Sequence, residues 1–143
     1  MLFNESLNLI NKFMEDSKIR RYCTEICKGY CCGNCKSISC MKKGNRPIGC
    51  AMFICRELRN ILFKPKEWQL YNDIMDDINS YWCKTIHKND IYFSNPENIK
   101  DIEKVRFPDR LKLYLEKFDV LNINKIINNM FLLYEIAGTK YII

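Results

Sequence analysis

Apolar residues recur at helical spacing over the first part of the chain. The positions that share one face of such a helix are Leu7, Ile10, Phe13, Met14 and, at its end, Ile19. Asn4 precedes them and is a candidate N-cap residue. The pattern therefore predicts a helix over residues 4–22.

Helical periodicity returns near Cys50 and ends before Pro65. Its apolar face consists of Phe53, Ile54, Leu58, Ile61 and Leu62. A longer helix is predicted from Pro65, which suits a first turn, to Ile86. The stripe expected to form core there consists of Trp68, Tyr71, Met75, Ile78 and Trp82.

The remaining pattern predicts further helices up to the C-terminus. The expected elements are a loop at 88–96, short helices at 96–105 and 109–121, and a last helix at 123–137. Gly138 follows the last helix as its predicted C′ residue. The fold class predicted from these elements is all-α, a small helical bundle.

Residues 22–49, between the two helical parts, lack this periodicity. Four of the five glycines lie here together with Pro47 and few large apolar residues, so the segment cannot bury enough apolar surface to order itself. Bound metal would supply the missing core, because its binding free energy then becomes folding free energy. We expect a single domain over residues 1–143, made of an N-terminal helix (1–22), a cysteine-cluster metal-binding segment (23–55) that forms a metal-nucleated loop between the first and second helices, and a helical bundle (56–143).

The expected location of the protein decides how its cysteines are interpreted. No segment reaches the roughly 18–20 apolar residues of a membrane span, and residues 1–19 lack the continuous apolar region of a signal peptide. We therefore expect a cytoplasmic protein with no membrane partner. Reducing compartments disfavour disulfides, and nine cysteines is an odd number. Metal ligation is thus preferred over disulfides and over inert buried thiols.

Eight of the nine cysteines lie within 33 residues. These predicted metal ligands are Cys23, Cys27, Cys31, Cys32, Cys35, Cys40, Cys50 and Cys55. Eight thiolates suffice for two four-thiolate sites, and both Zn²⁺ and a [4Fe–4S] cluster take four. Cys32 and Cys35 form a C-x-x-C with Gly33 inside it and are expected to share a centre. The adjacent Cys31 and Cys32 point in different directions and are expected to serve separate centres. Cys83 is predicted to be a buried thiol outside this set.

Positive charge is concentrated in the same segment. Residues 18–46 contain eight basic residues and one acid, a local charge of +7, so the rest of the chain carries −1 of the net +6. Two four-thiolate centres would carry a formal charge of about −4, which these cations would offset. Since zinc and [4Fe–4S]²⁺ give the same sum, charge does not choose between them.

Two stretches of the segment resemble a known family. The dense run that ends in Cys31-Cys32, followed by Arg-Pro-Ile-Gly-Cys-Ala-Met-Phe-Ile-Cys over residues 46–55, is similar to the YkgJ-type cysteine-cluster family. The match covers about a quarter of the chain. Its opening departs from the family pattern, because the intervals are three residues where the family usually has two. The resemblance implies chelation of zinc or iron and favours iron–sulfur centres.

Two functions follow from these features. The first is an iron–sulfur protein with one or two centres, active in electron transfer or redox sensing with an unknown protein or redox partner. An enzymatic role would be that of an iron–sulfur oxidoreductase component. The alternative is a structural zinc module whose helical part binds a protein or nucleic-acid partner.

Other chemistry is less well supported. Basic residues around Tyr22 and Tyr30 suit nucleic-acid binding, but neutralisation of thiolates is preferred because the basic excess is confined to the cysteine segment. His87 is the only histidine, which leaves a histidine-based triad or multi-histidine metal site without support. No Gly-rich nucleotide-binding motif is present.

Overall fold

The structure, a computed structural model, describes residues 2–27, 51–85 and 109–138. Within these ranges the chain forms six α-helices and one short π-helix, with no strand. The elements are α1 (Phe3–Asp16), α2 (Ile19–Tyr22), the π-helix η1 (Cys23–Cys27), α5 (Arg56–Leu62), α6 (Pro65–Thr85), α7 (Arg110–Glu116) and α8 (Val120–Ala137). The prediction of an all-α bundle is confirmed for this part of the chain.

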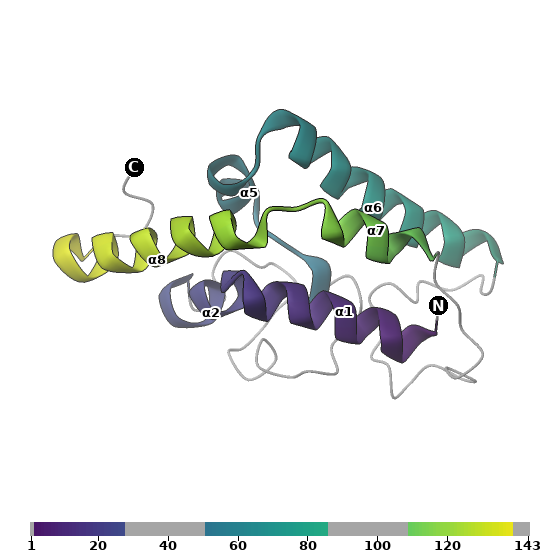
Figure 1. The fold of residues 1–143 in the computed structure, drawn as a ribbon, viewed down its shortest axis with the longest axis horizontal. Coiled ribbons are helices and arrows are strands. Elements are labelled where there is room, and N and C mark those ends of the chain that lie inside the picture. The colour runs from purple at the N-terminus through teal and green to yellow at the C-terminus, as the bar shows by residue number, and fades with distance from the viewer. Residues whose placement is uncertain (1, 28–50, 86–108, 139–143) are drawn as a thin grey trace.

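Helices α7 and α8 follow one another across the middle of the molecule (Figure 1). Helix α1 contacts both of them, α2 contacts α8, and α6 contacts α7. In the view of Figure 1, α1 and α6 lie on opposite sides of α7. Among the described helices, none is long and apolar enough to cross a membrane.

One apolar core connects these helices. The largest of its fully buried side chains are those of Tyr22, Ile10, Ile19, Ile54, Leu58, Ile74 and Leu111. They come from α1, α2, the segment before α5, α5 itself, α6 and α7. The residues that flank the cysteine segment therefore belong to the same core as the rest of the bundle.

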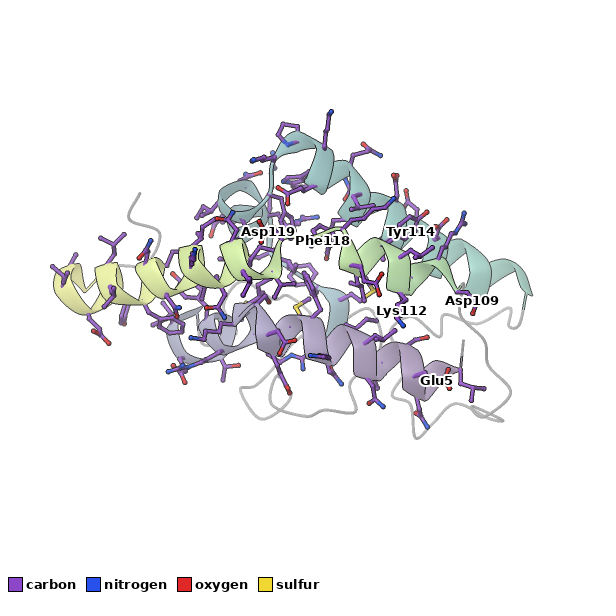
Figure 2. The ribbon with its side chains drawn as sticks, viewed as in Figure 1. Glu5, Asp109, Lys112, Tyr114, Phe118 and Asp119 are labelled. Atoms are coloured by element: carbon purple, nitrogen blue, oxygen red, sulfur yellow. The ribbon has the colours of Figure 1, made fainter. Side chains whose placement is uncertain are left out.

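A row of aromatic rings crosses this core. Phe118, in the turn between α7 and α8 (Figure 2), lies 5.4 Å from the ring of Phe13 and 5.3 Å from that of Phe63. The ring of Phe63 lies 6.0 Å from that of Tyr71. These separations fall within the range of favourable aromatic pairs, so the row connects α1 with α6.

The predicted first helix begins earlier and is interrupted. Helix α1 starts at Phe3, so Asn4 lies inside it, and Glu5 accepts a hydrogen bond from the Leu2 N–H at 3.1 Å instead. The break falls at Lys18, whose φ of 65° is left-handed, a conformation that opposes helix continuation. The buried Ser17 hydroxyl donates to the Met14 carbonyl and accepts from the Ile19 N–H, both at 3.3 Å. One side chain thus ends α1 and supports the start of α2.

The predicted helix near Cys50 also differs from the observed one. Ala51 and Met52 are helical, residues 53–55 are not, and α5 begins only at Arg56. The longer helix predicted from Pro65 is confirmed as α6, which extends over all described residues up to Thr85. It contains the predicted core residues Tyr71, which is buried, and Trp68, which packs against the core.

The C-terminal helices are confirmed with shifted bounds. Helix α7 ends at Glu116, and α8 begins three residues earlier than predicted because the Asp119 carboxylate accepts a hydrogen bond from the Asn122 N–H at 3.0 Å. Gly138 follows α8 with a φ of 68°, the left-handed conformation predicted for it. The loop predicted at 88–96 and the helix predicted at 96–105 lie outside the described residues.

Candidate metal centre

Three of the eight predicted ligands lie in the described part of the chain. Cys23 begins η1 and Cys27 ends it, and Cys55 directly precedes α5. Those outside the described residues are Cys31, Cys32, Cys35, Cys40 and Cys50. Of Cys27, as of Cys83 within α6, the structure describes the backbone alone.

The first two predicted ligands bound a π-helix. In η1 the backbone continues directly from α2 with wider i to i+5 turns. Cys23 and Cys27 have three residues between them, which is nearly one turn of this wider helix. Their Cα atoms therefore lie on the same side of the helix. Short π-helical segments are rare and occur frequently at functional sites. The interval that departs from the family pattern therefore coincides with an unusual backbone.

Polar contacts within one turn stabilise this part of the chain. The Thr24 hydroxyl donates to the Arg20 carbonyl at 2.9 Å. The Arg21 guanidinium pairs with the Glu25 carboxylate at 3.2 Å and lies 5.1 Å from the ring centre of Phe131 on α8. Cys23 itself is half-buried and packs against the core. The beginning of the cysteine segment is thus attached to α8.

Cys55 lies at the other end of the segment and is buried, with 6% of its surface exposed. Its backbone is extended, with φ −62° and ψ 154°, and its carbonyl accepts the Arg59 N–H at 3.0 Å. Cys55 is therefore the N-cap residue of α5. Its position is fixed by the start of that helix.

The hydroxyl of Tyr71 on α6 fixes the residues before Cys55. It donates to the Met52 carbonyl at 2.7 Å and accepts from the Ile54 N–H at 3.2 Å. Burial raises the pKa of Tyr71 to about 12, although the hydrogen bond from Ile54 and the Arg59 cation act in the opposite direction. The hydroxyl therefore stays protonated and keeps its donor role at ordinary pH.

A long-range hydrogen bond joins α2, just before the cysteine segment, to a residue near the end of that segment. The Arg20 guanidinium, three residues before Cys23, donates to the carbonyl of Ala51 at 3.4 Å. Ala51 and Cys55 belong to the core cluster against which Cys23 packs. The described residues on either side of positions 28–50 therefore contact one another within the same core.

The described donors suit a soft metal but do not by themselves form a site. Cys23 and Cys55 are present as thiols, and thiolate is the ligand that zinc and iron–sulfur clusters take. Within residues 2–27, 51–85 and 109–138, no three potential ligands come together. A complete four-thiolate site would need cysteines from the rest of the predicted set.

Sequence patterns did not reveal Arg20 or Tyr71 as residues of this region. Arg20 contributed only to the count of basic charges, and Tyr71 was predicted to be a core residue. A buried tyrosine hydroxyl needs a hydrogen-bond partner, which was the available signal for Tyr71. Its partners lie 17 and 19 residues away, a separation that periodicity does not address.

Comparisons with known proteins add no relative. No family model matches this chain, and no curated protein or solved structure matches it.

Proposed function

We propose that this chain is a cytoplasmic metal-binding protein of the YkgJ-like cysteine-cluster type, with one or two iron–sulfur centres that serve electron transfer or redox sensing. The alternative within the same proposal is a structural zinc module. The observation that carries the proposal is the Arg20–Ala51 hydrogen bond, because the two residues that it joins enclose seven of the eight clustered cysteines, and Cys55 follows four residues later.

The physical reason is loop closure. Closing a long flexible loop costs entropy that grows with its length, and here packed core side chains and the Arg20 contact already hold the loop ends. Thiolates in the loop then need less additional ordering to gather around a metal. Cys23 and Cys55, one on each side of residues 28–50 in the sequence, both contact this core and would supply two of the soft donors.

When bound, an iron–sulfur centre would supply one-electron chemistry, and zinc would supply only structure. The chain's own residues would position the backbone and exclude water with either metal. Arg20 and Tyr71 hold the backbone at the loop ends, and the core excludes water from Cys55.

Nucleic-acid binding is less favoured, because the described cations near the loop already contact protein groups. Arg20 donates to Ala51, Arg21 pairs with Glu25, and the Lys18 ammonium donates to the Asn128 side chain at 2.9 Å. A phosphate backbone would have to compete with these contacts.

The test is the metal content of the full chain purified without oxygen. Elemental analysis should find iron together with sulfide, and the absorption spectrum should show a visible band that bleaches on reduction. A colourless protein that contains zinc would favour the alternative. Cys35→Ser should lower metal content and thermal stability together, and the matched Cys83→Ser variant should retain wild-type metal content. Metal-free wild-type protein, or full metal content in the Cys35 variant, would contradict the proposed site.

A further inference from the structure

The short segment between the predicted ligands Cys50 and Cys55 is held by a side chain from another helix. Residues 51–54 connect Cys50 with Cys55, and residues 53–55 lack the helical conformation that both neighbours have. Ile54 is fully buried and Met52 nearly so. A buried backbone group that is not part of a helix needs another hydrogen-bond partner.

The Tyr71 hydroxyl supplies this partner on both sides of the bend. It binds the Met52 carbonyl and the Ile54 N–H, at 2.7 and 3.2 Å, and therefore bridges the residue between them. Tyr71 is itself 4% exposed and stands in the first half of the 21-residue helix α6. Its ring is fixed by Phe63 on one side and by the Arg59 guanidinium, 5.5 Å from the ring centre.

We propose that Tyr71 is a positioning residue of the metal centre: its hydroxyl keeps residues 53–55 out of the helix and so sets the direction of the Cys55 thiol. This inference rests on the proposed metal-binding function. If the bend were lost and helix α5 extended backwards, the extended backbone of Cys55 would become helical, and its side chain would take the next helical position, about 100° around the axis from that of Arg56. A cysteine rotated in this way could no longer meet a metal placed for its original direction.

The expected loss of metal affinity can be estimated from other proteins, in which some residues orient the metal ligands without touching the metal. Their substitution typically costs about 10–100-fold in metal affinity. Tyr71→Phe removes the hydroxyl and keeps the ring that contacts Phe63 and Arg59. Its ring packing is therefore retained, and the two hydrogen bonds are lost.

The experiment uses the full chain, prepared without oxygen and loaded with Zn²⁺ as a redox-silent probe. Zinc release to excess EDTA is followed with a colorimetric indicator, and amide hydrogen exchange is measured at Ile54. Tyr71→Phe should release zinc at least about tenfold faster than wild type and exchange the Ile54 amide faster. Phe13→Leu is the matched control, since it removes a buried ring of the same aromatic row, in α1, but neither hydrogen bond of Tyr71.

The outcomes separate the positioning role from general stability. The control should lower the melting temperature and leave the zinc release rate near that of wild type. Release from Tyr71→Phe at the wild-type rate, or equal acceleration in both variants at equal loss of melting temperature, would overturn the positioning role alone. An unfolded Tyr71→Phe protein would overturn it as well, because the hydroxyl would then support the whole fold. Wild-type protein that binds no Zn²⁺ and contains no iron would overturn the proposed function, and the positioning role with it.

Discussion

Helix α1 and the segment from Ala51 to Phe63 both contribute heavily to the core, but their backbones are stabilised in different ways. Helix α1 satisfies its backbone within 14 consecutive residues, and Ser17 completes its end. In residues 51–54, the side chains of Arg20 and Tyr71 provide hydrogen bonds from other helices. Substitutions in α1 should therefore change stability alone, whereas those around residues 51–63 should also move the predicted ligand Cys55.

The largest expected effects come from one buried aliphatic residue in each region. Ile10 in α1 is 1% exposed and Leu58 in α5 is fully buried, so Ile10→Ala and Leu58→Ala should each lower the free energy of unfolding by about 2–5 kcal/mol. Urea unfolding measures this loss. At temperatures where both variants are folded, Leu58→Ala should bind metal less tightly, and Ile10→Ala should bind it as wild type does. Equal metal affinity in the two variants would remove the proposed difference between the regions.

A second effect concerns alkaline pH. The pKa of Tyr71 is raised from 10.0 to about 12 in the folded chain, so its contribution to stability is complete below pH 10 and is lost as pH rises toward 12. The loss amounts to about 3 kcal/mol at most. Denaturant unfolding of wild type and Tyr71→Phe across this range isolates the contribution, because the lysines titrate in both proteins. Parallel curves for the two proteins would show that Tyr71 titrates normally.

A smaller effect is expected from the contact that closes the loop. Arg20→Met keeps an apolar stem but removes the donor to the Ala51 carbonyl, which should cost about 1 kcal/mol of stability and weaken metal binding. The control is Lys12→Met, which breaks the shorter, exposed contact with Asp16 at 2.7 Å. Thermal unfolding should show the larger loss of stability for Arg20→Met, and metal titration should show weaker binding for Arg20→Met and unchanged binding for Lys12→Met. A larger loss of stability in Lys12→Met than in Arg20→Met would mean that the length of a hydrogen bond matters more here than its position beside the cysteine segment.

The smallest expected effect lies far from the loop ends. Arg110 of α7 pairs with Asp77 of α6 at 2.7 Å, and 57% of the arginine side chain is exposed. Arg110→Gln should lower stability by about 0.5 kcal/mol, as exposed ion pairs usually do, and leave metal binding unchanged. A change in metal affinity here would indicate that α7 also influences the centre. Thermal unfolding together with metal titration provides the check.

Much of the helical framework could be predicted because the relevant signals are local. The stripe of apolar residues beginning at Trp68 predicted α6, and Gly138 predicted the end of α8. The break at Lys18 was missed, because it depends on the buried Ser17 hydroxyl that bonds to both flanking turns. The earlier start of α8 was missed because the capping role of Asp119 carries little periodic signal.

The amino-acid sequence alone determined the all-α class, the approximate helices and the concentration of thiols and positive charge in one segment. These follow from periodicity and composition, which are properties of neighbouring residues. Only the tertiary structure decided that Arg20, before this segment, contacts Ala51 near its end, and that residues 53–55 are not helical. Both depend on hydrogen bonds between residues 17–31 positions apart, which form only once the helices have packed against one another.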